Sequence, residues 1–477
     1  MSAIFYIMRK LRLFFTGRLF PCLLLALLFS AAGVFMALWL PRALAPVAVL
    51  ERVFSLAAAI LVALSPSLPS TKIAKLLLLL LLPWTGAFLC ILWQNRAPMP
   101  AFEARNLPKS VTEEVANLAV SKPVFAQSVE YFPVGSEAFA RMTDDVLKAK
   151  QRIYLEFYIV AEGRLWGRIL PLLERKAREG VKVFIIADGL GSALTLPRSF
   201  GKNLRAKGIC FAIYRPVRFP LKDSNRRDHR KIAVIDGIAY TGGVNLADEY
   251  VGERIRFGHW KDTAVRVTGE PAEEFAELFR THWAILTKES LPMSEFQSGN
   301  IPCVVCADDG RERLARRAPR VLFRLIAGAK RTLYLNTPYL APDTSLLDAL
   351  KSAAAAGVDV RLMIPHLPDK RAVFLITRHF ARELEQAGVK VREYEAGFLH
   401  AKSLVLDGRC AFVSSYNLDC RSLYLQAECG LFIEDAALAG AVERDFLAAW
   451  EAGVPVPKQT AAARFLGALL RLFSPII

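Results

Sequence analysis

Two copies of one short pattern contain the residue types needed for chemistry at a phosphodiester. Each copy has a histidine, a lysine and an aspartate at the same spacing: His229, Lys231 and Asp236, then His400, Lys402 and Asp407. A histidine can act as nucleophile or proton donor near neutral pH, because its unperturbed pKa is about 6.5. A lysine offers positive charge to phosphate oxygens, and a carboxylate can orient and stabilise an imidazolium. The pattern predicts a catalytic site to which each copy supplies one side, with the aspartates orienting the histidines.

Small residues and an asparagine follow each copy of the pattern. They are Gly242, Gly243 and Asn245 in the first copy, and Ser414, Ser415 and Asn417 in the second. We expect Asn245 and Asn417 to donate amide hydrogen bonds to phosphate or to position the site, with Gly243 and Ser415 supporting them. The alternative is that both asparagines are ordinary turn residues. One His-x-Lys pair could arise by chance, but two copies with identical spacing and similar sequels favour function.

The pattern predicts a buried strand at each copy. Alternate residues of a strand share a face, so His229 and Lys231 point the same way. Apolar residues follow at 232–235 and 404–406, and each run ends at an Asp-Gly turn. Each strand therefore begins with two polar groups and continues into the core.

The chain also repeats itself outside the pattern. Residues 149–156 resemble 329–336, and residues 180–183 resemble 357–360. In both halves, β-rich runs alternate with stretches of helical period, for example 166–179 and 345–356. This predicts an α/β fold of two repeated mixed-sheet domains, residues 101–300 and 301–477, packed together. The two histidines would then meet where the domains join, which is a common place for ligand sites.

Residues 1–100 are expected to form a membrane anchor with two or three transmembrane helices. The chain carries a net charge of +17, and the stretch 19–40 has no charged residue. About 20 apolar residues span a bilayer. The stretch 76–93 is a second candidate, whereas 53–64 spans only if it starts near Ala43 and tolerates Glu51 and Arg52. Two spans would leave the domains inside and three would place them outside, since the basic start favours an inside N-terminus.

Several sequence blocks together resemble the phospholipase D superfamily and, within it, the bacterial cardiolipin synthases. The blocks are residues 225–231, 242–250, 258–263, 337–343, 397–402 and 417–428. Departures at Ser414-Ser415, Gln426-Ala427 and Lys75 leave every catalytic group of the pattern in place. The resemblance implies a multi-pass protein of the bacterial cell membrane that binds anionic phospholipid and no nucleic acid.

The activity implied by the resemblance is phosphatidyl transfer between two phosphatidylglycerol molecules. It gives cardiolipin and glycerol through a phosphatidyl-histidine intermediate, without metal or other cofactor. In the family the first copy of the pattern attacks, so His229 is expected to be the nucleophile and His400 the general acid. The resemblance also makes Glu428 a candidate to orient a site histidine.

Other polar residues and other functions stay open. Glu156 could also hold a site histidine, and His259 could support the site or contact substrate, whereas His282, His366 and His379 have no partner pattern. Cys303 and Cys306 form one unaccompanied pair, so no zinc site is expected. The tail at 464–473 has helical apolar spacing and could dock on lipid or pack as an ordinary helix.

Some competing functions would use the same catalytic site, and others would not need it. The runner-up is a phospholipase D or a phosphatidyltransferase that uses water or another alcohol. A nucleic-acid phosphodiesterase fits the basic charge but not the apolar stretches, and a non-catalytic scaffold does not fit two intact patterns. The sequence leaves the oligomeric state and the acyl-chain preference open.

Overall fold

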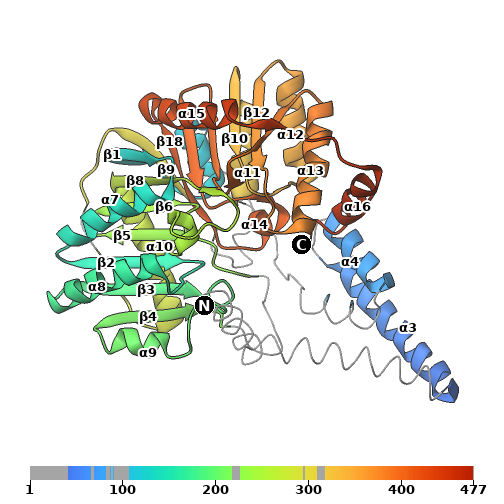
Figure 1. Ribbon diagram of the computed structural model, residues 1–477, viewed down its shortest axis with the longest axis horizontal. Coiled ribbons are helices and arrows are strands. Elements are labelled where there is room, and N and C mark those ends of the chain that lie inside the picture. The colour runs from blue at the N-terminus through green and yellow to red at the C-terminus, as the bar shows by residue number, and fades with distance from the viewer. Residues whose placement is uncertain are drawn as a thin grey trace.

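One large mixed sheet runs through both halves of the molecule (Figure 1). The computed structural model describes residues 41–65, 69–81, 86, 90, 107–216, 226–293, 296–308 and 317–475. The sheet has 15 strands in the order β19-β13-β12-β10-β15-β16-β18-β9-β1-β8-β6-β5-β2-β3-β4. Helices cover it, so the expected mixed α/β fold is confirmed.

The elements of the first half follow one another as strands and helices. They are α6 (Val111–Ala119), β1 (Val124–Phe132), α7 (Gly135–Lys148), β2 (Arg152–Phe157), α8 (Arg164–Arg178), β3 (Lys182–Asp188), α9 (Phe200–Arg205), β4 (Ile209–Tyr214), β5 (Lys231–Ile235), β6 (Ile238–Gly242), β7 (His259–Lys261), β8 (Ala264–Gly269) and α10 (Glu270–Thr287).

The second half repeats most of this succession. They are β9 (Ile301–Ala307), α11 (Arg317–Gly328), β10 (Thr332–Asn336), α12 (Thr344–Ala355), β12 (Asp359–Pro365), α13 (Arg371–Gln386), β13 (Lys390–Tyr394), β14 (Gly397–Leu399), β15 (Ser403–Leu406), β16 (Cys410–Ser414), α14 (Cys420–Tyr424), β18 (Cys429–Glu434), α15 (Ala436–Glu451), β19 (Val454–Pro455) and α16 (Ala461–Arg471).

The strand order shows the internal repeat. Outward from the centre, β1, β8, β6, β5, β2, β3 and β4 in one half correspond to β9, β18, β16, β15, β10, β12 and β13 in the other. The halves join where β1 pairs antiparallel with β9, with Val124 opposite Cys303. The repeat detected in the sequence is therefore a repeat of topology, whereas the exact domain limits at 100 and 300 stay a prediction.

Aliphatic and aromatic side chains from both faces of the strands form the core. One cluster combines α10 and α15 with strands of both halves. Tyr154 stacks on Phe279 at 4.6 Å, and Tyr334 stacks on Phe446 at 5.0 Å in the corresponding place of the second half. Two further clusters pack α7, α8 and α9 against the first half and α11, α12 and α13 against the second. Burial on both faces holds the central strands, and so the motif residues, in place.

The predicted anchor is only partly covered by the described residues. The stretch 19–40 lies outside them, and 76–93 is described only in part. The stretch 53–64 belongs to α3 (Pro41–Leu64), which precedes α4 (Pro69–Leu81). Among the residues with described positions, none of the helices combines the length and apolar character that crossing a membrane requires.

Candidate active site

The two motif histidines lie just before equivalent strands, β5 and β15. Both side chains are buried, and both line one cavity of about 630 Å³. Each motif lysine bonds back to its own histidine: Lys231 Nζ donates to the His229 carbonyl, and Lys402 Nζ donates to the His400 carbonyl. Lys402 Nζ also lies 2.7 Å from His400 Nδ1. The structure therefore brings the two halves of the predicted site together.

Each histidine segment is attached to the opposite half of the chain. The His229 N–H donates to the Ala427 carbonyl at 2.7 Å, next to a parallel bridge between Asp228 and Ala427. The His400 N–H donates to the Lys261 carbonyl at 2.7 Å, as β14 and β7 pair in parallel. These backbone bonds cross between the repeats and set each histidine beside a residue of the other half.

A buried carboxylate from the opposite half holds each imidazole. His229 Nδ1 lies 2.9 Å from both carboxylate oxygens of Glu428, and His400 Nδ1 lies 2.5 Å from Asp262 Oδ2. Both carboxyl groups are fully buried. Such a contact fixes the ring orientation and the tautomer, which directs Nε2 to the reaction. Among the residues whose positions are described, neither Nε2 has a hydrogen-bond partner.

Glu428 and Asp262 occupy equivalent places in the repeat. Gly430 in β18 pairs with Ser414, the last residue of β16, and Glu428 stands two residues before Gly430. In the same way, Ala264 in β8 pairs with Gly242, the last residue of β6, and Asp262 stands two residues before Ala264. The resemblance made Glu428 a candidate, but Asp262 was not predicted. An alignment of the two halves of the sequence, with Gly242-Gly243 opposite Ser414-Ser415, could have identified Asp262. In such an alignment Asp262 and Glu428 both stand just before the next strand.

The prediction that Asp236 and Asp407 orient the histidines is wrong. Asp236 accepts hydrogen bonds from the backbone N–H groups of residues 150–152, and Asp407 accepts them from residues 330–332. Both aspartates follow the far end of their strand, in turns with φ of 49° and 54°. A strand rises about 3.3 Å per residue, so its length separates each aspartate from its histidine.

Replacing Asp407 is therefore expected to change stability rather than catalysis. Asp407→Ala should lower the free energy of unfolding by about 1–2 kcal/mol, because three backbone N–H groups lose their acceptor. Burial raises the pKa of Asp407, but the N–H groups of Thr332, Arg331 and Lys330 outweigh it and lower the pKa below the usual value. The stabilisation is thus complete above about pH 4 and is lost as the pH falls through the lowered pKa. Thermal melting and the rate per folded molecule measure the two effects; a large rate loss at unchanged stability would contradict this role.

Burial controls the protonation of the site groups. Burial, followed by the charge of the neighbouring lysines, lowers the pKa of both histidines well below the usual value. Burial raises the pKa of Glu428 to about 8 and that of Asp262 to about 7. Desolvation also lowers the pKa of Lys231 to about 8 and that of Lys402 to about 7. A phosphate anion in the cavity would stabilise the charged lysines, so the site is suited to an anionic ligand.

Aromatic side chains surround both imidazoles in the cavity. The Tyr158 ring centre lies 4.8 Å from that of His229, and the Trp260 and Tyr250 rings lie 5.3 Å and 5.4 Å from that of His400. Sequence reasoning did not identify these rings, since no spacing relates them to the motifs. They limit the access of water to both histidines.

The predicted supporting residues divide into two groups. Asn417 lines the cavity, whereas the Asn245 amide is used within the fold, accepting from the Ile159 N–H at 3.0 Å and donating to the Tyr250 hydroxyl at 2.7 Å. Ser415 Oγ donates to Glu428 at 2.5 Å. At Gly243 a side chain would place Cβ 2.0 Å from Asp262 Oδ1, so the absence of a side chain makes room for that carboxylate.

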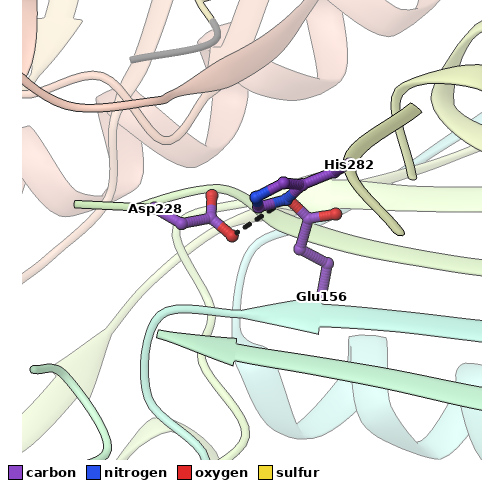
Figure 2. Close-up of side chains that lie close together, drawn as sticks. All are labelled: Glu156, Asp228 and His282. Atoms are coloured by element: carbon purple, nitrogen blue, oxygen red, sulfur yellow. Dashed lines mark hydrogen bonds and ion pairs between the residues drawn. The ribbon is translucent and has the colours of Figure 1, made fainter. Parts of the chain in front are cut away.

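The remaining candidates lie away from the two histidines. Glu156 does not hold a motif histidine, because its Oε1 lies 3.0 Å from His282 Nδ1 (Figure 2). His259 Nδ1 bonds the Tyr394 hydroxyl at 2.8 Å. Cys303 and Cys306 belong to different core clusters on β9, so they point to opposite faces of the sheet and cannot share a metal.

Comparisons with known proteins agree with this geometry. Residues 322–450 match the family described as "Cardiolipin synthase, PLD-like domain". The chain is 36% identical over 359 residues to a cardiolipin synthase of Geobacillus thermodenitrificans, which covers 72% of this chain and 71% of the relative. It is 36% identical over 365 residues to a cardiolipin synthase of Listeria monocytogenes, covering 73% of this chain and 75% of the relative.

A solved structure shares the fold at low sequence identity. The phosphatidylserine synthase of Haemophilus influenzae superposes with a TM-score of 0.59 at 15% identity, covering 77% of this chain and all of that one. At this identity the likeness concerns the fold alone.

Proposed function

The chain belongs to the cardiolipin synthase family, and from this premise we propose that it joins two phosphatidylglycerol molecules into cardiolipin and glycerol through a phosphatidyl-histidine intermediate. It is an enzyme of the phosphatidyltransferase class. One observation carries the proposal: two histidines that lie just before equivalent strands line one cavity, and a buried carboxylate of the opposite half holds each at Nδ1. This arrangement supplies a nucleophile and a proton donor on two sides of one phosphorus atom.

In the proposed first step, His229 Nε2 attacks the phosphorus of the donor phosphatidylglycerol. The N–P bond forms as the P–O bond to the glycerol headgroup breaks. His400, protonated at Nε2, gives that proton to the departing glycerol oxygen. Glu428 and Asp262 stabilise the positive charge on the two imidazoles, as buried carboxylates do in other acid–base pairs.

In the proposed second step, a hydroxyl of the second phosphatidylglycerol attacks the same phosphorus. His400 takes the hydroxyl proton, the new P–O bond forms and the N–P bond breaks, which restores both histidines. Lys231 and Lys402 supply positive charge near the phosphate oxygens. Splitting one displacement into two is the usual logic of covalent catalysis.

The cavity and its surroundings suit a lipid with an anionic headgroup. Val373 and Ile376 contribute apolar lining, while Lys370 and Arg421 contribute positive charge. Ser474, just after α16, also lines the cavity. Phe465, Leu466 and Leu469 on α16 are exposed. We propose that this helix faces the surface of a bacterial membrane, to which residues 1–100 attach the protein.

The product distinguishes this function from its runner-up. Purified full-length protein in vesicles of phosphatidylglycerol should accumulate cardiolipin and free glycerol in equal amounts. Accumulation of phosphatidic acid instead would mean that water is the acceptor and that the protein is a phospholipase D. Added short-chain alcohols would reveal any other acceptor.

Activity is expected to survive removal of divalent metal. The proposed steps use the charge of Lys231 and Lys402 where other phosphoryl-transfer enzymes use a metal ion. Dialysis against EDTA should leave the rate within about twofold, because general electrostatic stabilisation comes from residues of the chain. The measurement is cardiolipin synthesis before and after dialysis. A loss in chelator that one specific metal restores would contradict the proposed steps.

A further inference from the structure

A second buried group of charged side chains lies behind His229, outside the cavity. Glu156 from β2, Asp228 and Arg230 from the segment before β5, and His282 from α10 are all at most 4% exposed. Arg230 Nε lies 3.2 Å from Asp228 Oδ1 and 3.4 Å from Glu156 Oε1. His282 Nδ1 lies 3.0 Å from Glu156 Oε1 and 3.7 Å from Asp228 Oδ2 (Figure 2). We call these four residues the rear network.

The rear network holds the residues on both sides of His229. Asp228 and Arg230 flank the histidine, and alternation along an extended segment sends their side chains away from its face. The Asp228 N–H donates to Asp188 Oδ2 at 3.0 Å, and the Arg230 N–H donates to Asp228 Oδ1 at 3.3 Å. These contacts fix the peptide groups from which the His229 ring projects.

Among the described residues of the second half, the equivalent positions carry no corresponding network. Glu156 lies opposite Ile232, and Asn336 lies opposite Ser403. Ile232 and Ser403 each follow their motif histidine by three residues, so Asn336 is the counterpart of Glu156. By their distance from the motif histidines, Leu399 and Ala401 correspond to Asp228 and Arg230. Phe279 and Phe446 are equivalent, because they stack on the equivalent residues Tyr154 and Tyr334. His282 and Ala449 each follow that phenylalanine by three residues, so Ala449 is the counterpart of His282. The charged side chains behind His229 are thus replaced by apolar or neutral ones behind His400.

The composition of the network favours a shared proton over a metal ion. Two carboxyl groups face one guanidinium, and a buried net charge is costly, so one proton between the carboxyls balances the group. Glu156, Asp228 and His282 have the spacing of a metal site, but Arg230 already provides their positive charge. Burial, then the charge of Glu156, raises the pKa of Asp228 to about 7.

We infer that the rear network positions His229 and makes the two histidines unequal, so that the first half and not the second supports the nucleophile. The inference rests on the proposed function, because the rear network is assigned the role of orienting His229 for the covalent step. The groups that face the network are Asp188 from β3, Tyr214 from β4 and Cys429 from β18. The network contacts no substrate, so its members are positioning residues.

A matched pair of variants tests the inference. Glu393 in β13 is fully buried, and it binds His366 Nδ1 at 2.8 Å and Arg378 Nε at 2.6 Å, away from the motif histidines. Glu156→Gln and Glu393→Gln therefore each replace a buried carboxylate that binds a histidine and an arginine, one in each half. Full-length protein in phosphatidylglycerol vesicles would be mixed with labelled lipid, and the rate of phosphohistidine formation followed against pH, with thermal melting in parallel.

Glu156→Gln is expected to slow phosphohistidine formation about 10- to 100-fold, since small misplacement of a reacting group has effects of this size. Its pH–rate inflection should move to lower pH, because removing the Glu156 charge lowers the pKa of Asp228. Glu393→Gln should lower the melting temperature, because it breaks a buried ion pair, but its rate per folded molecule should stay within about twofold of the wild-type rate.

Three results would overturn the inference. The first is equal rates in the two variants. The second is a slower rate with an unmoved pH profile. If Glu156→Gln does not fold, His282→Gln against His366→Gln gives the same comparison, and equal rates in that pair also overturn it. A wild-type protein that forms cardiolipin without phosphohistidine refutes the covalent step of the proposed function, and a wild-type protein that forms no cardiolipin refutes the proposed activity. Both outcomes are read from the wild type alone and so are distinguishable from failure of the inference.

Discussion

His229→Ala and His400→Ala are each expected to reduce cardiolipin synthesis to near background while the protein still folds. Loss of the general acid alone typically costs about 10²–10⁴ in rate, and loss of the nucleophile should cost at least as much. The effects should not add, because the two histidines act in one sequence of steps. The double variant should therefore be little slower than either single variant.

The measurement is conversion of labelled phosphatidylglycerol by equal amounts of folded protein. His366→Ala is a suitable control, since His366 binds Glu393 and does not line the cavity with His229 and His400. Near-normal turnover by either motif variant would refute the two-histidine mechanism.

Glu428→Gln and Asp262→Asn are expected to have the second largest effect. An amide in place of the carboxylate can present its NH₂ to Nδ1 and select the wrong tautomer, which in a related acid–base arrangement costs about 10⁴ in rate. We expect each variant to lose about 10²–10⁴ in turnover. Because the carboxylates cross between the halves, Glu428→Gln should affect the step at His229 and Asp262→Asn the step at His400.

The contribution of Glu428 to stability should respond to pH in the opposite direction from activity. The pKa of Glu428 is raised to about 8, so between about pH 4.5 and 8 the folded chain holds a proton that the unfolded chain releases. Raising the pH through this range therefore removes the stability contributed by Glu428, although it ionises the carboxylate that catalysis needs. Glu428→Gln should lose this part of the pH dependence of melting and still be inactive. An active Gln variant, or one with unchanged pH dependence, would contradict this role.

The sequence predicted the elements that carry the site because local patterns determine them. Apolar runs after each His-x-Lys pair indicated β5 and β15, and the repeat of 149–156 at 329–336 indicated a repeated unit. The sequence also indicated both histidines, both lysines and Glu428, and the structure brings these residues together.

The sequence could not predict which carboxylate reaches which histidine. That depends on the pairing of β7 with β14 and of Asp228 with Ala427, which are contacts between distant parts of the chain. Asp236 and Asp407 were expected to orient the histidines because they belong to the same motif, but the length of one strand separates each of them from its histidine. A count of residues along the strand could have excluded them, since side chains at its two ends cannot meet.

Trapping the covalent intermediate tests the two-histidine mechanism most directly. Full-length protein is mixed with phosphatidylglycerol labelled in its phosphatidyl group, quenched in base to preserve phosphohistidine, digested and mapped by mass spectrometry. We expect label on His229 in the wild type and its loss in His229→Ala. In His400→Ala the label should persist, because the nucleophile is intact and glycerol can still depart slowly. Label on His400 alone would reverse the two roles, and cardiolipin synthesis with no labelled histidine would contradict the covalent mechanism.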